Sequence, residues 1–394
     1  MIEYCRNCGW DELESVLDLG DQYLSDFRDD DAKPAKYPLH LLFCKQCALA
    51  QLSESAPPSE MYHENYSFKS GVNPAIKDDL ESIVHDALAI HWNAKNWLDI
   101  ASNDGTLLSF VPKHIYRIGI DPLRQFAPEA AQHANQIISD FFAPHYFATK
   151  FDIITSISMF YDLDDPNAFV AGVKKVLADD GIWIVQQNYL LTMIESNSFD
   201  NISHEHVTYF CLTTLVNLLH AHGLEVNDVT LGPVNGGVFR VVISHAQTRF
   251  VSPNVDKLLQ REEEFFKSGK LQWFRTNTKK LLADLTYKVN FLREHGKTIY
   301  VYGASTRGGT IWQAANLEFD YVVDRNPEKV GKKMSAINAE IISEDDMRAN
   351  PPDCLLVGPW WFKDQFVARE QEYLKNGGKM IFPIPKVEIV GYDD

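Results

Sequence analysis

The stretch Trp97-Leu98-Asp99-Ile100-Ala101-Ser102-Asn103-Asp104-Gly105 decides the fold of this chain. Its first four residues are mostly apolar and predict a short strand, and the remaining five predict a turn into a helix that begins at Thr106. A strand, turn and helix in this order begin an open parallel α/β sheet. The turn carries acidic and small polar residues where a dinucleotide fingerprint would place repeated glycines beside a pyrophosphate.

The same alternation of strand and helix continues on both sides of this stretch. Apolar residues at helical spacing predict an amphipathic helix over residues 78–94, before the first strand. Two alternating segments near the end of the first unit predict a hairpin, and a second α/β unit follows. The predicted strands are residues 116–120, 151–155, 181–186, 224–230 and 237–244 in the first unit, and 298–302, 319–323 and 354–357 in the second.

The first unit predicts a cationic ligand. A carboxylate-rich turn repels phosphate and suits the sulfonium and amino groups of S-adenosylmethionine (SAM). Asp121 closes the second strand, where it can accept hydrogen bonds from a ribose diol, and Asp140 can accept from the adenine amine. Each residue also has a local alternative, because Asp104 can cap a helix and Asp121 can belong to a turn. The predicted cofactor contacts are Asp99, Ala101, Ser102, Asn103, Asp104, Gly105, Asp121, Asp140, Phe141, Phe142 and Ser156.

Two cysteine pairs near the N-terminus, Cys5-x2-Cys8 and Cys44-x2-Cys47, predict a zinc site. Each pair places two thiolates on one tight turn, so the two pairs can close a tetrahedral shell. The alternative is four unrelated buried cysteines. No neighbouring residue suggests an open coordination position, which indicates a structural ion. Residues 9–43 contain few apolar runs, so we expect this lobe to depend on the metal for its fold.

Composition limits the classes of function. With 394 residues and 45% hydrophobic content, the chain can form two or three domains. The net charge of −17 argues against a nucleic-acid surface. No apolar stretch is long enough to span a membrane and no signal sequence is evident, so we expect a cytoplasmic protein. The predicted domains are a zinc-binding domain (1–70), a SAM-binding domain (71–250), and a charged, solvated helical connector with a Rossmann-like domain (251–394).

A second glycine-rich turn, at residues 303–309, predicts an anion site. Backbone N–H groups at the start of a helix, together with the cation of Arg307, would make a phosphate cradle, and Asp324 could hold a ribose. The alternatives are a turn without a ligand and an NAD site, although the turn lacks a full GxGxxG. The predicted substrate contacts are Gly303, Ser305, Thr306, Arg307, Gly308 and Asp324.

His204-Glu205-His206 is a candidate acid/base cluster. A glutamate beside a histidine can orient the imidazole and raise its basicity, as a proton-abstracting base requires. A metal site is the less favoured alternative, because no third ligand is evident. An ordinary surface loop is a further alternative.

Taken in order, the four cysteines and the motifs D-I-A-S-N-D-G, N-I-S-H-E-H, N-G-G-x-x-R and G-A-S-T-R-G resemble the sugar C-methyltransferases over nearly the whole chain. These three-domain enzymes methylate C3 of nucleotide-linked 4-keto deoxysugars. The resemblance implies that the middle domain binds SAM and that the C-terminal domain helps to hold the nucleotide sugar. It also implies that a base removes the C3 proton and that the resulting enolate attacks the methyl group of SAM.

Carried over by position, the resemblance implies that His206 is the base and Glu205 its partner, with Tyr66 and Asn235 in active-site segments. Tyr161 stands where better-known members have a histidine, and Ser203 where they have a tyrosine, which indicates a sister branch. The implied catalytic set is His206, Glu205, His204, Tyr66, Tyr161 and Asn235.

Alternative functions remain open at this point. In a sugar O-methyltransferase, His206 would deprotonate an alcohol instead of a carbon. A non-catalytic sugar-nucleotide-binding protein is a second alternative, and an NAD oxidoreductase fits least because both turns lack its fingerprint. The identity of the nucleotide and sugar, the methylated atom, the pathway and the oligomeric state are not specified by these motifs.

Overall fold

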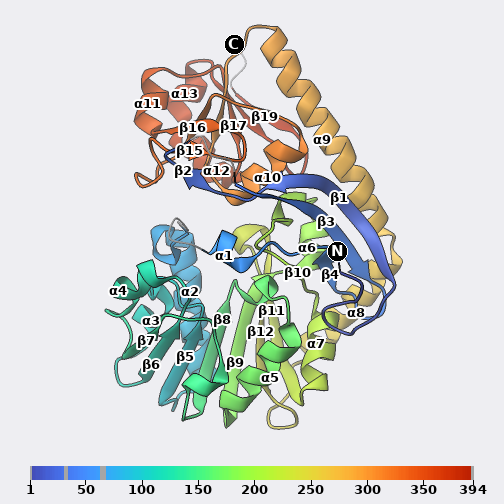
Figure 1. Cartoon of the computed structure of the whole chain (residues 1–394), viewed down its shortest axis with the longest axis vertical. Helices are drawn as coiled ribbons and strands as arrows, with labels where there is room; N and C mark the ends of the chain where they lie inside the picture. Colours follow the sequence, from blue (N-terminus) through green and yellow to red (C-terminus); the bar gives the residue numbers. More distant parts are fainter. Residues whose placement is uncertain (1, 31–33, 63–67, 392–394) are drawn as a thin grey trace.

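The structure is a computed structural model that describes residues 2–30, 34–62 and 68–391. Its strands form three sheets, of four, seven and eight strands. Figure 1 shows the seven-stranded sheet in the lower half of the molecule, the eight-stranded sheet in the upper half, and the N-terminal strands between the two. Within the described part of the chain, no helix combines the length and the apolar character needed to cross a bilayer.

The seven-stranded sheet has the order β11-β12-β9-β8-β5-β6-β7. All neighbours are parallel except β12, which runs antiparallel to β9 and β11, so the predicted hairpin inserts its second strand into the sheet. The strand order reverses between β5 and β8, and the carboxyl ends of the strands at such a switch point are the usual ligand position in these sheets. The strands are β5 (Asn96–Ile100), β6 (Tyr116–Ile120), β7 (Gln136–Ile138), β8 (Phe151–Ile157), β9 (Leu177–Asn188), β11 (Leu224–Gly232) and β12 (Val238–His245).

Helices cover both faces of this sheet. The predicted helix over 78–94 is α2 (Pro74–Ile90), which starts earlier because the Asn73 side chain accepts from the Ala75 N–H and Pro74 suits a first helical position. Its apolar side packs with Trp97 and Leu108 in one buried cluster. The other principal helices are α3 (Thr106–Phe110), α5 (Pro166–Val176), α6 (Leu190–Glu195) and α7 (Leu212–Ala221).

The eight-stranded sheet has the order β19-β18-β17-β13-β14-β16-β15-β2. Its centre is parallel and corresponds to the second α/β unit, with α10 (Thr306–Ala314) following β13. Its last strand, β2 (Phe27–Arg28), comes from the N-terminal part of the chain. The other strands are β13 (Ile299–Tyr302), β14 (Tyr321–Val323), β15 (Lys333–Met334), β16 (Ala339–Ile342), β17 (Cys354–Val357), β18 (Lys379–Phe382) and β19 (Glu388–Val390).

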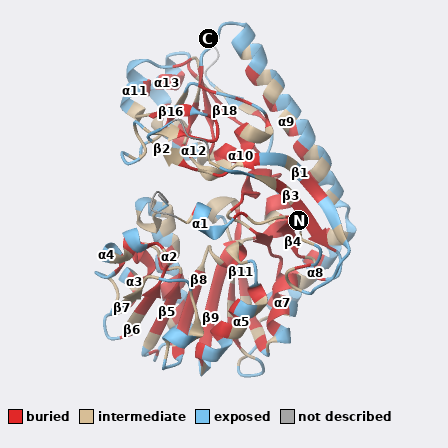
Figure 2. Ribbon diagram, in the orientation of Figure 1, coloured by how far each residue is buried: buried red, intermediate tan, exposed pale blue. Residues whose placement is uncertain are grey.

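The N-terminal lobe has apolar packing in addition to its four-cysteine cluster. Long strands β1 (Leu13–Tyr23) and β3 (Lys36–Cys44) pair with each other, and β4 (Ala50–Leu52) pairs with β10 (Thr208–Tyr209) of the middle region. Buried residues of β1 and β3 share one continuous core with the seven-stranded sheet (Figure 2). The end of β3 is an apolar run that the sequence does show, whereas irregular pairing interrupts the alternation along β1 and hides that strand in the sequence.

Two helices, α8 (Pro253–Lys267) and α9 (Lys270–Glu294), connect the two larger sheets, and α9 runs along one side of the molecule (Figure 1). The charged run was predicted to be a solvated face, and for Glu262 that prediction is wrong. Its carboxylate is fully buried and accepts from the Leu212 and Thr213 N–H groups at 2.6 and 2.7 Å and from the Tyr189 hydroxyl at 2.8 Å. Glu262 thus caps the start of α7, whose own N-cap residue supplies no side-chain bond.

Candidate active site

The four cysteines of the N-terminal lobe form one cluster. The sulfur of Cys5 lies 3.6 Å from that of Cys47, and the sulfur of Cys8 lies 3.6 Å from that of Cys44. All four sulfur atoms lie within 4.8 Å of one another. A tetrahedral zinc ion with Zn–S bonds of about 2.3 Å needs sulfur–sulfur separations of roughly 3.8 Å, so a cluster of this size suits the ion. Four thiolates would complete the coordination of a zinc ion, as in a structural site.

The predicted cofactor turn has an unusual backbone. Ala101 and Asn103 have φ values of 60° and 50°, in the left-handed region that non-glycine residues rarely adopt. Gly105 also lies there, and a Cβ at this position would be 2.7 Å from the Cα of Ala130. The turn therefore holds its backbone against the cavity at a conformational cost, which is typical of ligand-binding turns.

Two aspartates end the neighbouring strands β5 and β6. Asp99 is buried, and burial raises its pKa to about 7, although a hydrogen bond from the Thr155 hydroxyl (2.6 Å) opposes the shift. Asp121 accepts from the Asn103 N–H and the Leu123 N–H, both at 2.8 Å. These bonds fix the carboxylate while each oxygen keeps a further lone pair for a hydroxyl ligand.

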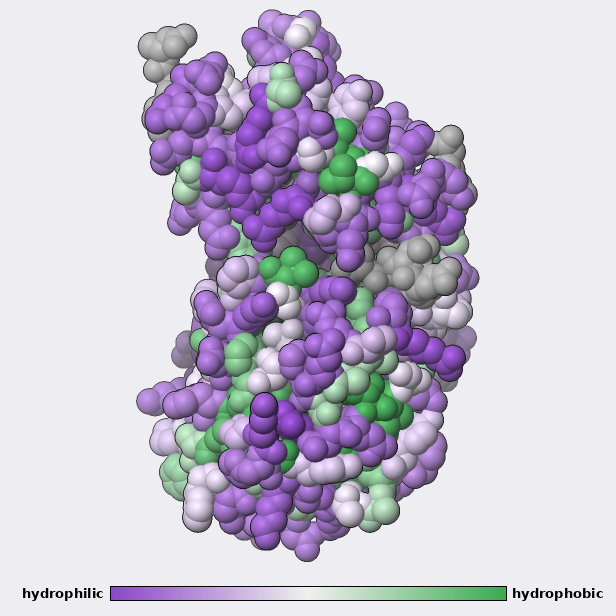
Figure 3. All heavy atoms as spheres, turned by 90° about the vertical axis from the view of Figure 1, so that its left-hand side faces the viewer, coloured by the Kyte–Doolittle hydropathy of each residue, from purple (hydrophilic) through white to green (hydrophobic). Residues whose placement is uncertain are grey.

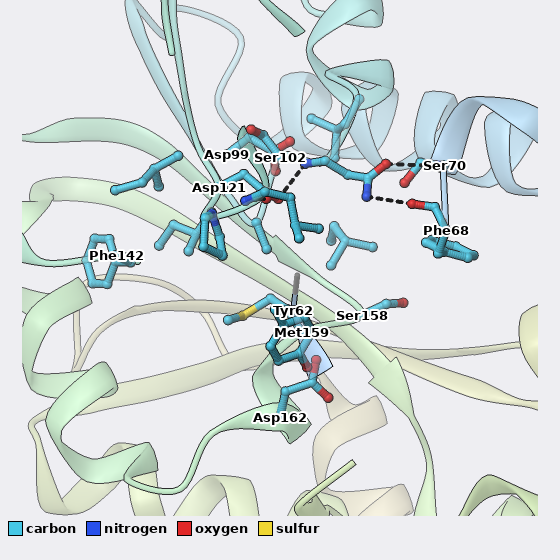
Figure 4. Close-up of a pocket in the computed structure, with 18 of the residues that line it drawn as sticks. Tyr62, Phe68, Ser70, Asp99, Ser102, Asp121, Phe142, Ser158, Met159 and Asp162 are labelled. Atoms are coloured by element: carbon cyan, nitrogen blue, oxygen red, sulfur yellow. Dashed lines mark hydrogen bonds between the residues drawn. The ribbon is translucent and has the colours of Figure 1, made fainter. Parts of the chain in front are cut away.

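The cavity beside these strands is lined by acidic side chains, two of which, Asp79 and Asp164, pair with Arg240 and Arg6. Figure 4 shows Asp99, Ser102 and Asp121 across the cavity from Tyr62, Met159 and Asp162. Six aspartates and no lysine, arginine or histidine occur among the described residues that line it: Asp79, Asp99, Asp121, Asp140, Asp162 and Asp164. Such a lining fits a cation with a ribose, and it disfavours a pyrophosphate.

The structure places most of the predicted cofactor residues around this cavity, and three away from it. Asp104 accepts from the Thr106 N–H and hydroxyl and from the Gly71 N–H, so it caps α3 and anchors the preceding segment. Gly105 lies behind the turn, against Ala130. Ser156 accepts from the Trp183 indole at 3.1 Å and lies inside β8, not after it, because that strand continues to Ile157.

Several lining residues were missed by the sequence reasoning. Phe68 and Ser70 are tied to the cofactor turn, since the Asn103 amide donates to the Phe68 carbonyl and accepts from the Ser70 N–H, both at 3.0 Å. Ser158, Met159 and Asp162 line the opposite wall, after the end of β8. Ser158 has a φ of 54°, and such backbone strain is not evident from sequence.

A larger cleft adjoins the acidic cavity. Figure 3 shows the surface hollowed between the upper and lower halves of the molecule. Residues of the N-terminal lobe (Phe27), the middle region (His206) and the C-terminal region (Trp361) all contribute to its walls. The cleft and the acidic cavity share the lining residues Tyr62, Phe68, Ser158, Asp162 and Asn235. The acidic cavity and the cleft therefore adjoin at these residues.

His206 lines the cleft in a defined orientation. Its Nδ1 lies 2.9 Å from the Asn201 carbonyl, which can only accept, so Nδ1 carries the proton and Nε2 keeps its lone pair. The Tyr161 ring packs edge-on against the imidazole, with centroids 4.3 Å apart. Burial lowers the His206 pKa to about 4 and raises that of Glu205 to about 7. The backbone of Asn201, not Glu205, orients the imidazole, which differs from the expectation.

Some of the other predicted catalytic residues line the cleft, and others do not. Tyr161 and Asn235 line the cleft with Glu205 and His206. His204 faces the N-terminal lobe, where its Nε2 lies 3.0 Å from the Tyr37 carbonyl, and it does not line the cleft. Tyr66 lies outside the described residues.

Four of the six predicted substrate residues line the C-terminal wall of the cleft, three of them as expected for a substrate site. Ser305 and Thr306, at the start of α10, and Asp324 line the cleft, whereas Gly303 and Gly308 do not. Arg307 also reaches the cleft, but its Nε donates to Asp200 at 2.8 Å. Its charge is therefore neutralised within the protein, contrary to the expectation of a free cation for phosphate.

Comparison with known proteins agrees with this arrangement. Three family models match: "Putative zinc binding domain" over residues 5–62, "Methyltransferase domain" over 75–229 and "C-methyltransferase C-terminal domain" over 233–385. C-methyltransferase NovU of Streptomyces niveus is 27% identical over 409 residues, which cover 99% of this chain and 97% of that protein.

The chain is a SAM-dependent methyltransferase.

SAM is the methyl donor of this methyltransferase, and zinc belongs to its N-terminal lobe. Similar solved structures overlay only part of the chain. N-methyltransferase NodS from Bradyrhizobium japonicum WM9 has a TM-score of 0.36 and 15% identity and covers 45% of this chain and 99% of its own. Magnesium protoporphyrin IX methyltransferase from Synechocystis PCC 6803, with bound SAH, has a TM-score of 0.37 and 12% identity and covers 45% and 90%.

Proposed function

We propose that this methyltransferase methylates the carbon beside the ketone of a nucleotide-linked deoxysugar, with His206 as the proton acceptor. The observation that carries the proposal is the junction of the acidic cavity with the cleft, at residues that line both. SAM bound in the cavity supplies an electrophilic methyl group. A substrate carbon in the cleft can then meet it in line, and positioning of this kind is the main requirement of methyl transfer.

The state of His206 supports a role as base. The imidazole is neutral at pH 7, because burial holds its pKa near 4, and its Nε2 lone pair is available. So low a pKa makes His206 a weak base, and the substrate proton must therefore be acidified by stabilising the developing enolate oxygen. The hydroxyl of Tyr161 can donate to that oxygen, since burial raises its pKa well above the ordinary value and keeps it protonated.

The C-terminal wall supports a phosphorylated substrate through residues other than Arg307. Arg325 is exposed in the cleft, and its guanidinium has no hydrogen bond or ion pair within the described part of the chain. Ser305 and Thr306 begin α10, whose N-terminal N–H groups favour an anion. The Asp324 carboxylate accepts from the Ala304 N–H at 2.8 Å and sits at the end of β14, where a ribose can bind.

The proposal is tested with labelled SAM and a panel of nucleoside diphosphate sugars. We expect methylation of 4-keto-6-deoxysugar nucleotides and none of the matched nucleotides whose sugar lacks the ketone. Arg325→Met should raise the KM for the accepted substrate roughly tenfold, the effect of losing one charge-assisted hydrogen bond of about 1.5 kcal/mol. Equal methylation of keto and non-keto sugars by the wild-type enzyme would refute the carbon-acid mechanism.

A further inference from the structure

The Arg307 side chain joins the C-terminal domain to the turn that precedes His206. Its Nε donates to the Asp200 carboxylate at 2.8 Å, and its Nη1 donates to the Asn235 carbonyl at 2.6 Å. The guanidinium also lies 4.0 Å from the centroid of the Trp361 ring, within cation–π range. The side chain is only 11% exposed, so these contacts are shielded from water.

Asp200 receives a second bond from the same domain. The Trp360 indole donates to the same carboxylate oxygen at 3.0 Å, and the Asp200 side chain is fully buried. A third contact joins the two elements, because the Thr310 hydroxyl of α10 donates to the Ile202 carbonyl at 3.3 Å. The short helix η5 (Phe199–Asn201) and the residue that follows it are thus bound to the C-terminal domain on one side.

The other side of this turn holds the proposed base. The Asn201 carbonyl accepts the His206 Nδ1–H at 2.9 Å, and the Asn201 side chain accepts from the Asn188 amide at 2.8 Å. Only one peptide unit separates the Asp200 side chain from the Asn201 carbonyl. A displacement of Asp200 must therefore move the group that fixes the imidazole.

We propose that Arg307 is a positioning residue across the domain interface: through Asp200 it holds the Asn201 carbonyl where it fixes the tautomer and orientation of His206. The catalytic part of this inference rests on the proposed role of His206, and the structural part does not. The proposal replaces the role predicted from the sequence, since a guanidinium that is paired with a buried carboxylate offers little net charge to a phosphate.

The direct test is histidine-selective ¹⁵N NMR of the zinc-loaded protein, with His206 assigned by the His206→Ala variant. The wild type should show the tautomer protonated at Nδ1. In Arg307→Gln, which removes the charge and the Nε donor, His206 should become a mixture of tautomers, and Arg307→Lys should restore the wild-type signal in part. Arg348→Gln breaks a bond to the buried Glu370 elsewhere in the C-terminal domain and should leave the His206 signal unchanged.

Kinetics supply the second readout. Arg307→Gln should lower kcat by roughly 10- to 100-fold, the range expected when a reacting group is misplaced by about 1 Å, with the KM of the nucleotide substrate and the Kd of SAM little changed. Should Arg307→Gln fail to fold because Asp200 is left charged and buried, the variant Asp200→Asn/Arg307→Gln removes that charge and should show the same tautomer mixture.

Two results would overturn the proposal: a wild-type His206 signal in folded Arg307→Gln, or a raised KM with unchanged kcat, which would return Arg307 to phosphate binding. Full activity of His206→Ala would instead reject the proposed base, and the tautomer result would still decide whether Arg307 positions the imidazole.

Discussion

Asp99 gives the cofactor site a pH dependence that can be calculated. Burial raises the pKa of this carboxyl to about 7, with the nearby charge of Asp121 adding to the shift. A cationic group of SAM favours the ionised carboxylate, so the affinity must rise as the pH passes upward through that value. With a pKa of about 7, the ionised fraction rises from roughly one tenth at pH 6 to nine tenths at pH 8, and the Kd should fall about tenfold.

The assay is calorimetry of SAM binding at pH 6, 7 and 8, in two buffers that differ in ionisation enthalpy. Asp99→Asn is the matched control, because the amide keeps an oxygen for the Thr155 hydroxyl. The amino group of SAM titrates in the same range with both proteins, so the ratio of the two Kd values isolates Asp99. That ratio should change about tenfold between pH 6 and pH 8, and a constant ratio would refute the assignment.

The raised pKa of Asp99 also makes the folding stability of the SAM-free protein depend on pH. This stability falls as the pH rises, whereas the affinity for SAM increases. Between the ordinary pKa of an aspartate and about 7, the folded state binds a proton that the unfolded state has released. The stability associated with Asp99 is therefore full below the ordinary pKa and is lost as the pH rises to about 7. Asp99→Asn should remove this loss, which thermal unfolding of the SAM-free protein at pH 5 and pH 8 would reveal.

Three further predictions concern separate parts of the molecule. Asp121→Ala should weaken SAM binding roughly 100-fold, because the loss of one charge-assisted hydrogen bond of about 2.7 kcal/mol is enough for that change. Calorimetry should show no change in SAM affinity for the control variant Asp179→Asn, whose carboxylate is exposed at the opposite end of the sheet. Equal losses of affinity in the two variants would exclude a contact between Asp121 and the ribose. Cys44→Ser should reduce the zinc content measured by atomic emission, and full retention would contradict the four-cysteine site. Glu262→Ala should lower the free energy of unfolding in urea by about 3 kcal/mol, because several buried N–H and hydroxyl donors lose their acceptor. The exposed Glu263→Ala variant should leave that free energy nearly unchanged, and similar values for the two variants would reject the buried cap.

The cofactor edge of the sheet was predictable because it follows from topology. Asp99 and Asp121 end successive parallel strands, and the carboxyl ends of such strands meet at one edge. The prediction placed Ser156 at that edge because it expected the strand to end at residue 155, two residues before its end in the structure. Within the longer strand its side chain points to Trp183 in the core, so a small error in a boundary changed the face.

The remaining differences come from partners that are distant in sequence. Glu262 lies in a run of charges, and only the tertiary fold brings the start of α7 to its carboxylate. Arg307 has the surroundings of an anion-binding turn, but Asp200, from another domain, is already its partner. His206 was expected to depend on the adjacent Glu205, yet a backbone carbonyl holds it, and backbone groups carry no sequence signal.

The central claim is that His206 removes a proton from the carbon beside the substrate ketone. The most direct measurement is hydrogen–deuterium exchange at that carbon, followed by NMR in deuterated water without SAM, using the 4-keto sugar nucleotide that the enzyme accepts. We expect exchange by the wild type and a rate lower by roughly 10²–10⁴ in His206→Ala, the usual effect of losing a general base. Absence of exchange by the substrate-bound wild type, or wild-type exchange by His206→Ala, would contradict it.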